Sequence, residues 1–201
     1  DYFISGNHAL AGFAYLLDYN NPTTNSSNTY GIEYTGTLLP WLKAHGMYAE
    51  QRDAGDATLA YDADYYLLEL TASRHGYYVN PGYEVLGSDD GKKGFATPLA
   101  TLHKFQGFAD KFLTTPKQGI RDIYLTLGGK KYQWEFAATW HDFQTDEASL
   151  DLGQEVDLVI SRPITSNLTG LAKYAHYDGS EETTTLAKDT DKAWFMLTAT
   201  F

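Results

Sequence analysis

The stretch Tyr132–Phe143, YQWEFAATWHDF, alternates large apolar side chains with polar ones at every second position. The apolar set on one side of an extended chain comprises Trp134, Phe136, Ala138 and Trp140. The set on the other side comprises Gln133, Glu135, Ala137, Thr139 and His141. Because successive side chains of a strand point to opposite faces, this period of two predicts a strand with one apolar face and one polar face.

Similar alternating segments recur along the whole chain, so we expect about ten strands in total. Besides Tyr132–Phe143 they are His8–Tyr19, Tyr30–Leu39, Leu42–Gln51, Leu59–Ala72, Tyr77–Gly87, Ile120–Leu127, Leu152–Ser161, Leu168–Tyr177 and Lys192–Phe201. Most are about 8–12 residues long, which is close to the roughly 9–11 that a tilted strand needs to cross a bilayer. Strands of soluble sheets peak nearer to 5–6 residues.

The connections between these segments alternate in length, long then short, from the first strand to the last. Residues 18–29 and 88–119 are long polar connections, whereas 40–41 and 73–76 are short. A meander in which every second loop is long is typical of outer-membrane barrels. We therefore expect an all-β fold, a transmembrane antiparallel up-and-down β-barrel, with residues 1–201 forming one region. The alternative is a tyrosine-rich soluble sandwich or barrel.

Composition agrees with this reading and excludes some partners. The chain carries 16 Tyr, 10 Phe and 4 Trp, and it contains no cysteine that could form a disulfide or a thiolate metal site. Its net charge of −11 argues against a nucleic-acid partner, because phosphates need a basic face. The chain opens without a basic, apolar leader, so we expect a processed protein or a piece of a longer one.

Charged side chains indicate which face of each strand lines the lumen, since a charge on the lipid side costs about 2–4 kcal/mol at mid-bilayer. In Leu59–Ala72 this rule turns the two aspartates inward and Tyr61, Ala63, Tyr65 and Leu67 outward. The predicted pore-lining residues are Glu33, Asp62, Asp64, Glu84, Asp122, Tyr124, Glu135, His141, Glu155, Asp157 and Lys173. Such an acidic lining favours hydrated polar or cationic solutes. The alternative is that these carboxylates pair with basic groups only to fill the barrel.

The longest connection, residues 88–118, is rich in apolar side chains, which argues against disorder. The spacing of Leu102, Phe105, Phe108 and Phe112 predicts about three turns of amphipathic helix. We expect this extracellular loop to fold over or into the pore and narrow it. Its constriction candidates are His103, Lys104, Phe105, Phe108, Asp110 and Lys111. The alternative is an outward cap that packs on a neighbouring subunit of a homo-oligomer.

The chain ends on AWFMLTATF, Ala193–Phe201, a strand with an exposed aromatic terminus. Phe195, Leu197, Ala199 and Phe201 share one side, which we expect to face lipid. Outer-membrane proteins commonly end in such a strand, and there it resembles the signal read by the barrel-insertion machinery. The alternative is a soluble sheet in which Phe201 packs inside.

Several stretches resemble the alginate-export family of Gram-negative outer-membrane barrels. They are GYEVLGSDDGKKGFATPLATLHKFQGFADKFLTTPKQGIRDIY (residues 82–124), WHDF (140–143), DLGQEVDL (151–158), AKYAHY (172–177) and DKAWFMLTATF (191–201). The resemblance implies a barrel of about 16–18 strands of which this chain is the C-terminal part, embedded among outer-membrane lipids and lipopolysaccharide. The alternative is that the ten strands close a barrel alone, since their number is even. The resemblance also implies passage of a saccharide.

The charge balance departs from that family, whose exporter is thought to have a basic lumen. Here 15 Lys and Arg stand against 26 Asp and Glu. We therefore expect a porin-like channel for small polar solutes or saccharides.

Motifs for enzymatic chemistry are scarce, so we expect no catalytic or metal site. No phosphate-binding loop, HExxH or G-x-S-x-G motif occurs. Asp89 and Asp90 are one candidate pair for Ca²⁺, although the full EF-hand spacing is absent. Two rival functions stay open: a non-conducting structural or adhesive barrel, and an outer-membrane hydrolase built around His141 and Asp142.

Overall fold

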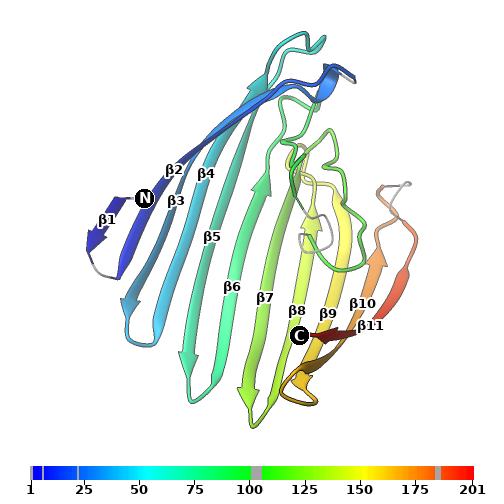
Figure 1. Ribbon diagram of the computed structural model, residues 1–201. Helices are drawn as coiled ribbons and strands as arrows, with labels where there is room; N and C mark the ends of the chain where they lie inside the picture. The colour runs from blue at the N-terminus through cyan, green and yellow to red at the C-terminus, as the bar shows by residue number, and fades with distance from the viewer. Residues whose placement is uncertain (1, 6, 22, 101–105, 184–186) are drawn as a thin grey trace.

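The computed structural model describes residues 2–5, 7–21, 23–100, 106–183 and 187–201 of the chain (Figure 1). Eleven strands form one antiparallel sheet in which every strand pairs with its neighbours in chain order. The strands are β1 (Tyr2–Ser5), β2 (His8–Leu17), β3 (Ser27–Leu39), β4 (Leu42–Asp53), β5 (Asp62–Arg74), β6 (Tyr77–Leu86), β7 (Ile120–Lys131), β8 (Trp134–Gln144), β9 (Asp151–Pro163), β10 (Leu168–Gly179) and β11 (Thr190–Ala199). A short 3₁₀ helix, η1, covers Thr23–Asn25.

The all-β, up-and-down architecture expected from the sequence is confirmed. All ten expected strands are present, and the short strand β1 is an eleventh that the alternation did not reveal. Connections also alternate as expected: 40–41, 75–76, 132–133 and 164–167 are short, whereas 18–26, 54–61, 87–119, 145–150 and 180–189 are longer. Figure 1 shows the short turns at its lower end and the long loops at its upper end.

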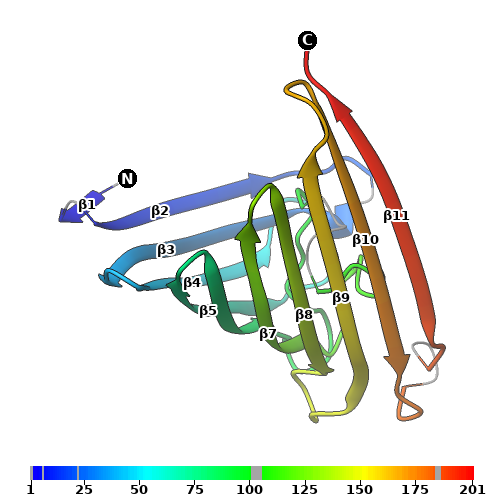
Figure 2. The ribbon, with the colours of Figure 1, turned by 90° about the horizontal axis from the view of Figure 1, so that it is seen from below.

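The sheet is bent into a trough that stays open in the described part of the chain. Seen from below, it curves from β2 through β7 to β11, and β2 and β11 lie at opposite rims (Figure 2). We call the inner side of this trough the concave face and the outer side the convex face. The connection between β6 and β7, residues 87–119, is called the inner loop, and its described residues, 87–100 and 106–119, lie inside the trough (Figures 1 and 2).

The convex face carries most of the exposed large apolar side chains. They include Tyr30, Ile32, Tyr48, Tyr66, Leu68, Leu70, Tyr83, Ile123, Leu125, Leu127, Trp134, Phe136, Trp140, Val156, Leu158, Ile160, Tyr174, Phe195 and Leu197. Leu68 and Leu127 are 57% and 54% exposed, which is far outside the range of core leucines. None of the described residues belongs to a helix long and apolar enough to cross a membrane.

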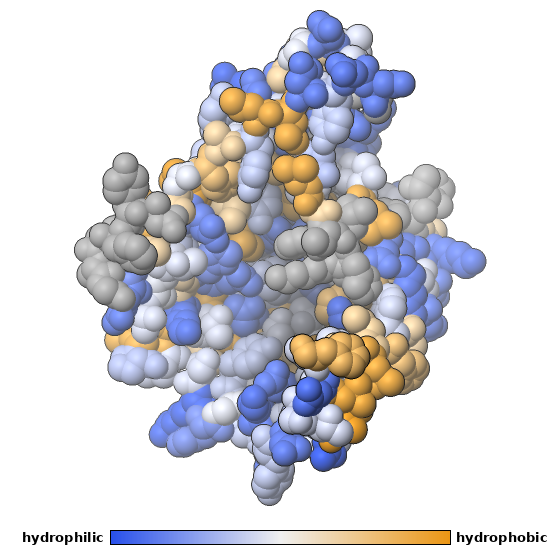
Figure 3. Space-filling view, in the orientation of Figure 1, coloured by the Kyte–Doolittle hydropathy of each residue, from blue (hydrophilic) through white to orange (hydrophobic). Residues whose placement is uncertain are grey.

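The concave face is polar along much of its surface, and its buried apolar core lies under the inner loop. Figure 3 looks into this side, where hydrophilic and near-neutral colours prevail and orange gathers on the loops and on the C-terminal strand. In the core, Phe112 of the loop packs on Phe143 of β8 with ring centroids 4.7 Å apart. Phe95 packs on Tyr65 of β5 at 5.4 Å. The loop therefore covers the trough from inside.

The expected faces hold in most strands and are wrong in β5. Tyr65 pairs with Ala49 of β4 and Leu86 of β6, and it points into the trough. Asp62 and Asp64 therefore lie on the convex face, not among the pore-lining candidates. Both sides of β5 carry apolar residues, so alternation does not separate them. The two aspartates lie at the polar end of the strand beside Arg52, where a charge can point outward at little cost.

A strict period of two turns Leu152 of β9 outward with Val156, Leu158 and Ile160, and this expectation is wrong. Leu152 is almost fully buried in the core cluster. The register of β9 against β8 shifts at this end of the strand, and Gly153 has a φ of +109°. Such an irregularity of the β-bulge kind redirects a side chain, and it cannot be read from a simple period of two.

The expected helix in the inner loop is also wrong over the described residues 106–112. Gln106, Gly107 and Asp110 have φ values of +53°, +84° and +57°, which an α-helix cannot accommodate. The segment forms successive turns instead. The remaining residues of the expected helix, 102–105, lie outside the described residues.

Candidate functional site

A chain of hydrogen-bonded polar side chains crosses the concave face at the middle of the strands. His45 of β4 lies between two carboxylates: its Nε2 is 2.8 Å from Glu33 of β3, and its Nδ1 is 2.7 Å from Glu69 of β5. The second carboxylate oxygen of Glu69 accepts a 2.8 Å hydrogen bond from the Tyr124 hydroxyl of β7. This chain links four strands that are up to 91 positions apart in sequence, from 33 to 124.

The reach of Tyr124 to Glu69 depends on a glycine in the strand between them. β6 separates β5 from β7, and Gly82 of β6 is the residue opposite Tyr124. A Cβ atom at Gly82 would come within 2.0 Å of the Tyr124 ring. Glycine is therefore required here because the ring lies directly over its backbone.

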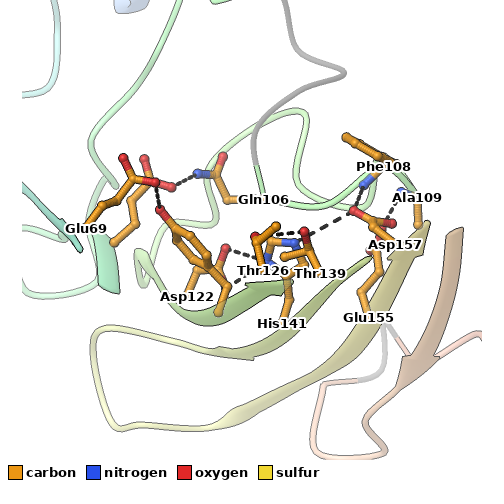
Figure 4. A network of polar contacts seen from close by, with 12 residues as sticks. Glu69, Gln106, Phe108, Ala109, Asp122, Thr126, Thr139, His141, Glu155 and Asp157 are labelled. Carbon is orange, nitrogen blue, oxygen red and sulfur yellow. Dashed lines mark hydrogen bonds and ion pairs between the residues drawn. The ribbon is translucent and has the colours of Figure 1, made fainter. Parts of the chain in front are cut away.

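A second group of polar residues lies on β7, β8 and β9 (Figure 4). The Nδ1 atom of His141 is 2.9 Å from Asp122, and its Nε2 atom is 3.7 Å from Asp157. Thr126 and Thr139 exchange a hydrogen bond of 2.9 Å across the same strands. Glu155 and Asp157 are only 1% and 3% exposed. Burying a carboxylate without an ion-pair or hydrogen-bond partner costs free energy, so the partners of Glu155 and Asp157 are needed for this region to be stable.

Those partners come from the inner loop (Figure 4). The backbone N–H of Phe108 donates to Asp157 at 2.9 Å, and that of Ala109 donates to Glu155 at 2.6 Å. The side-chain amide of Gln106 donates to Glu84 of β6 at 2.7 Å. Three wall carboxylates thus hold three of the four successive loop positions 106–109 against the concave face.

Lysines complete the attachment of the loop to the last two strands. Lys192 of β11 forms an ion pair of 2.9 Å with Asp110, and the ammonium of Lys173 of β10 lies 4.2 Å from the centre of the Phe108 ring. Lys111 of the loop lies over the Tyr177 ring at 4.7 Å. Burial against these elements lowers the pKa of Lys111. Residues 106–111 of the loop are therefore fixed to β6, β9, β10 and β11. On the opposite side of the trough, Phe95 and Ala96 of the loop contact β5 and β4.

Most of the residues expected to line a pore share the concave face. Those placed there by register and contacts are Glu33, Glu84, Asp122, Tyr124, Glu135, His141, Glu155, Asp157 and Lys173. Glu135 lies apart from the others, at the short-turn end, where it pairs with Lys130 at 2.5 Å. Among the loop candidates, Phe108, Asp110 and Lys111 contact the wall. His103, Lys104 and Phe105 lie outside the described residues.

Several residues of the site were missed in the sequence. Tyr65 and Glu69 were missed because the face of β5 was assigned the wrong way round, and they follow at once when its period is shifted by one. His45 and Lys192 lie on strands whose inner side chains form no obvious polar run. Gln106 carried no signal, since nothing in the loop sequence shows which wall residue it meets.

Two other kinds of site were considered in the sequence, a Ca²⁺ site at Asp89 and Asp90 and a hydrolase site at His141 and Asp142. Asp89 pairs with Lys92 at 3.2 Å, and Asp90 lies 4.0 Å from the same lysine. Among the described residues no group of three or more His, Cys, Asp or Glu is arranged to hold a metal ion. Asp142, which adjoins His141, points to the convex face and accepts a hydrogen bond from Gln154 at 2.9 Å. His141 thus works with Asp122 and Asp157 and not with its neighbour.

A substitution of Tyr65 tests how much the wall contributes to stability. Tyr65→Phe removes the 2.6 Å hydrogen bond that the hydroxyl donates to buried Glu84. We expect the free energy of unfolding in urea, followed by tryptophan fluorescence, to fall by about 1–2 kcal/mol. Tyr66→Phe is the matched control, because its hydroxyl meets Asp64 at an exposed convex site, and its effect should stay below about 0.5 kcal/mol. Equal losses in the two variants would contradict the assignment of faces in β5.

Chemically, the concave face offers carboxylates, imidazoles and hydroxyls that bind water, cations and hydroxylated solutes. The convex face offers almost only hydrocarbon and aromatic rings over the middle of the strands.

No family model matches the chain, and no curated protein sequence matches it. The geometry of these two faces therefore supplies the evidence for function.

Proposed function

We propose that this chain forms part of a porin-like β-barrel in the outer membrane of a Gram-negative bacterium, through which small polar solutes or saccharides diffuse. The observation that carries the proposal is the contrast between the two faces of one curved meander of long strands. A wet inner face and an apolar outer face are what a membrane barrel requires, because each lipid-facing side chain alternates with a lumen-facing one.

The arrangement of aromatic residues on the convex face supports a membrane environment. Near the long loops, the hydroxyl of Tyr48 donates to Asp64 at 2.8 Å and that of Tyr174 donates to Asp191 at 2.5 Å. At the opposite end, the guanidinium of Arg162 lies 5.0 Å from the centre of the Trp134 ring. Amphipathic rings with their polar atoms turned away from an apolar band are typical of the two membrane interfaces.

The large extent of the exposed apolar surface on the convex face also favours a lipid environment over an aqueous one. Soluble monomers rarely expose contiguous apolar patches larger than a few hundred Å². Here exposed Leu, Ile, Tyr and Trp side chains follow one another from β3 to β11 without an intervening charged row over the middle of the strands. A single membrane contact would cover all of them at once.

Closure of the barrel is part of the proposal. Among the described residues, β1 and β11 each have only one neighbouring strand. Unpaired edges attract further strands, because their backbone groups need hydrogen-bond partners in lipid. We infer that additional strands complete a barrel of about 16–18 strands, as the resemblance to the alginate-export family implies. The exposed terminal strand ending in Phe201 would then be available to the barrel-insertion machinery during assembly, with lipopolysaccharide and lipid around the finished barrel.

Reconstitution of the purified full-length protein into planar lipid bilayers tests the proposal. We expect stepwise increases in conductance, and a preference for K⁺ over Cl⁻ because carboxylates dominate the concave face. Heat-denatured protein is the control. Absence of steps from protein that is folded in lipid, as shown by a heat-dependent shift in gel migration, would contradict the channel.

One observation favours a second candidate, a non-conducting structural barrel. The inner loop makes many contacts with β6–β11, including the buried carboxylates Glu155 and Asp157. A barrel whose other strands close tightly on this loop would be filled. The same bilayer measurement separates the two candidates, since only the channel conducts.

A further inference from the structure

A cavity of about 500 Å³ lies between the inner loop and the concave faces of β2–β6. It lies on the side of the trough where Phe95 and Ala96 of the loop pack on β5 and β4. Its walls are mainly apolar, and the residues that matter most are Phe13, Leu17 and Met47 on the strands and Phe95, Pro98 and Leu99 on the loop. A volume of this size is typical of sites for small organic molecules.

The charged groups among the described residues that line the cavity all have one sign. Glu33 and Glu84 are among its described lining residues, and that lining includes no Lys, Arg or His. Glu84 already accepts hydrogen bonds from Tyr65 and Gln106. Glu33 contacts His45 through Oε1, and about a third of its side chain is exposed. Glu33 is thus the carboxylate that an incoming group can reach.

Gln51, the amide side chain nearest the loop in this cavity, is occupied by the protein itself. Gln51 donates to Thr29 and to the carbonyl of Ala96 at 2.9 Å each, and its own carbonyl accepts from the Ala96 N–H at 2.8 Å. A saccharide, whose many hydroxyls each need a partner, would find few of them here. An apolar body with a single charged end fits the lining better.

We propose that this cavity binds organic cations with an apolar body, such as arylalkylamines, and that Glu33 receives the ammonium group. The inference rests on the proposed function, because it names the class of solute that would pass between the loop and β2–β5. The apolar walls contribute hydrophobic contact area, and the carboxylate selects positive charge over neutral or negative head groups.

Calorimetric titration of the full-length protein in detergent with three matched probes tests this inference. The probes are 4-phenylbutylamine, 4-phenylbutanol and 4-phenylbutyrate, which differ only in the charge of the head group. Because a charge-assisted hydrogen bond is about twice as strong as a neutral one, we expect the amine to bind about tenfold more tightly than the alcohol. The carboxylate should bind most weakly. Equal affinities for all three probes would overturn the inference.

Two pairs of variants locate the site. Ala11→Trp fills the cavity from β2 and should abolish binding, whereas Ala14→Trp, on the convex face of the same strand, should leave it unchanged. Glu33→Gln should make the amine and the alcohol bind equally, whereas Glu50→Gln, at a convex position opposite Tyr30, should preserve the tenfold difference. Binding that survives Ala11→Trp would overturn the inference, since partition into detergent would then explain it.

The outcome can be separated from that of the channel itself. Conductance without selective amine binding would refute this inference and leave the channel standing. Selective binding without conductance would refute the channel and leave the cavity as a ligand site.

Discussion

Replacing Gly107 with alanine should release the inner loop from the concave face and raise the rate of trypsin cleavage after Lys111 roughly 30-fold or more. Gly107 has a φ of +84°, where a residue with a Cβ is strained by about 1 kcal/mol. The added Cβ would also lie 2.5 Å from Oε2 of Glu155, the carboxylate that receives the Ala109 N–H. Loss of that hydrogen bond adds about 1–2 kcal/mol, so the undocked population rises by the stated factor.

Gly91→Ala is the matched control for this experiment. Gly91 lies in the same loop with a φ of +73°, but a Cβ there would have no atom within 4 Å. Its backbone strain is therefore similar, while no contact with the wall is lost. If both variants were cleaved equally fast, close packing of Gly107 on Glu155 would not be what holds the loop. Under the proposed channel, Gly107→Ala should also increase conductance, because a displaced loop widens the passage.

Placing an arginine on the convex face should block stable insertion into lipid. Ala138 of β8 lies between Leu127 of β7 and Leu158 of β9, both exposed on that face. If these residues face the bilayer interior, Ala138→Arg costs about 2–4 kcal/mol in the free energy of folding into lipid vesicles. The measurement is the fraction of protein that refolds into vesicles as a function of urea concentration.

The adjacent residue is the control, because Ala137 points to the concave face between Gly128 and Val159. Ala137→Arg adds the same charge to the same strand, but on the wet side, so refolding into vesicles should change by less than about 1 kcal/mol. A larger loss for Ala137→Arg than for Ala138→Arg would show that the convex face is not the one in contact with lipid.

Much of the fold could be predicted because, in a meander, each strand pairs with its neighbours in the chain, so local sequence patterns indicate the architecture. In β8 the alternation of Trp and Phe with Glu, Thr and His indicates the strand and its two faces without reference to any other element. The same pattern failed in β5, since Tyr65 and Leu67 on one side are as apolar as Tyr66 and Leu68 on the other. There, only the register with β4 and β6 decides the face.

The candidate site was predictable in part for a similar reason. Asp122, His141 and Asp157 could be assigned to one face from their own strands, and in the structure they contact one another. The attachment of the loop could not be foreseen. It depends on backbone N–H groups of Phe108 and Ala109, which every residue possesses, and on positive φ values that replace the helix suggested by the apolar spacing.

The position of the inner loop in the chain imposes an order on assembly. The loop connects β6 to β7, which pair directly, yet its anchors Glu155 and Asp157 follow 46 and 49 residues later, and Lys192 follows Asp110 by 82. The loop can therefore settle only after β9 and β11 have been laid down. Until then the Phe112 ring lacks its partner on β8 and the acidic pair lacks its donors, so docking of this segment is a late event that reports completion of the C-terminal half of the sheet.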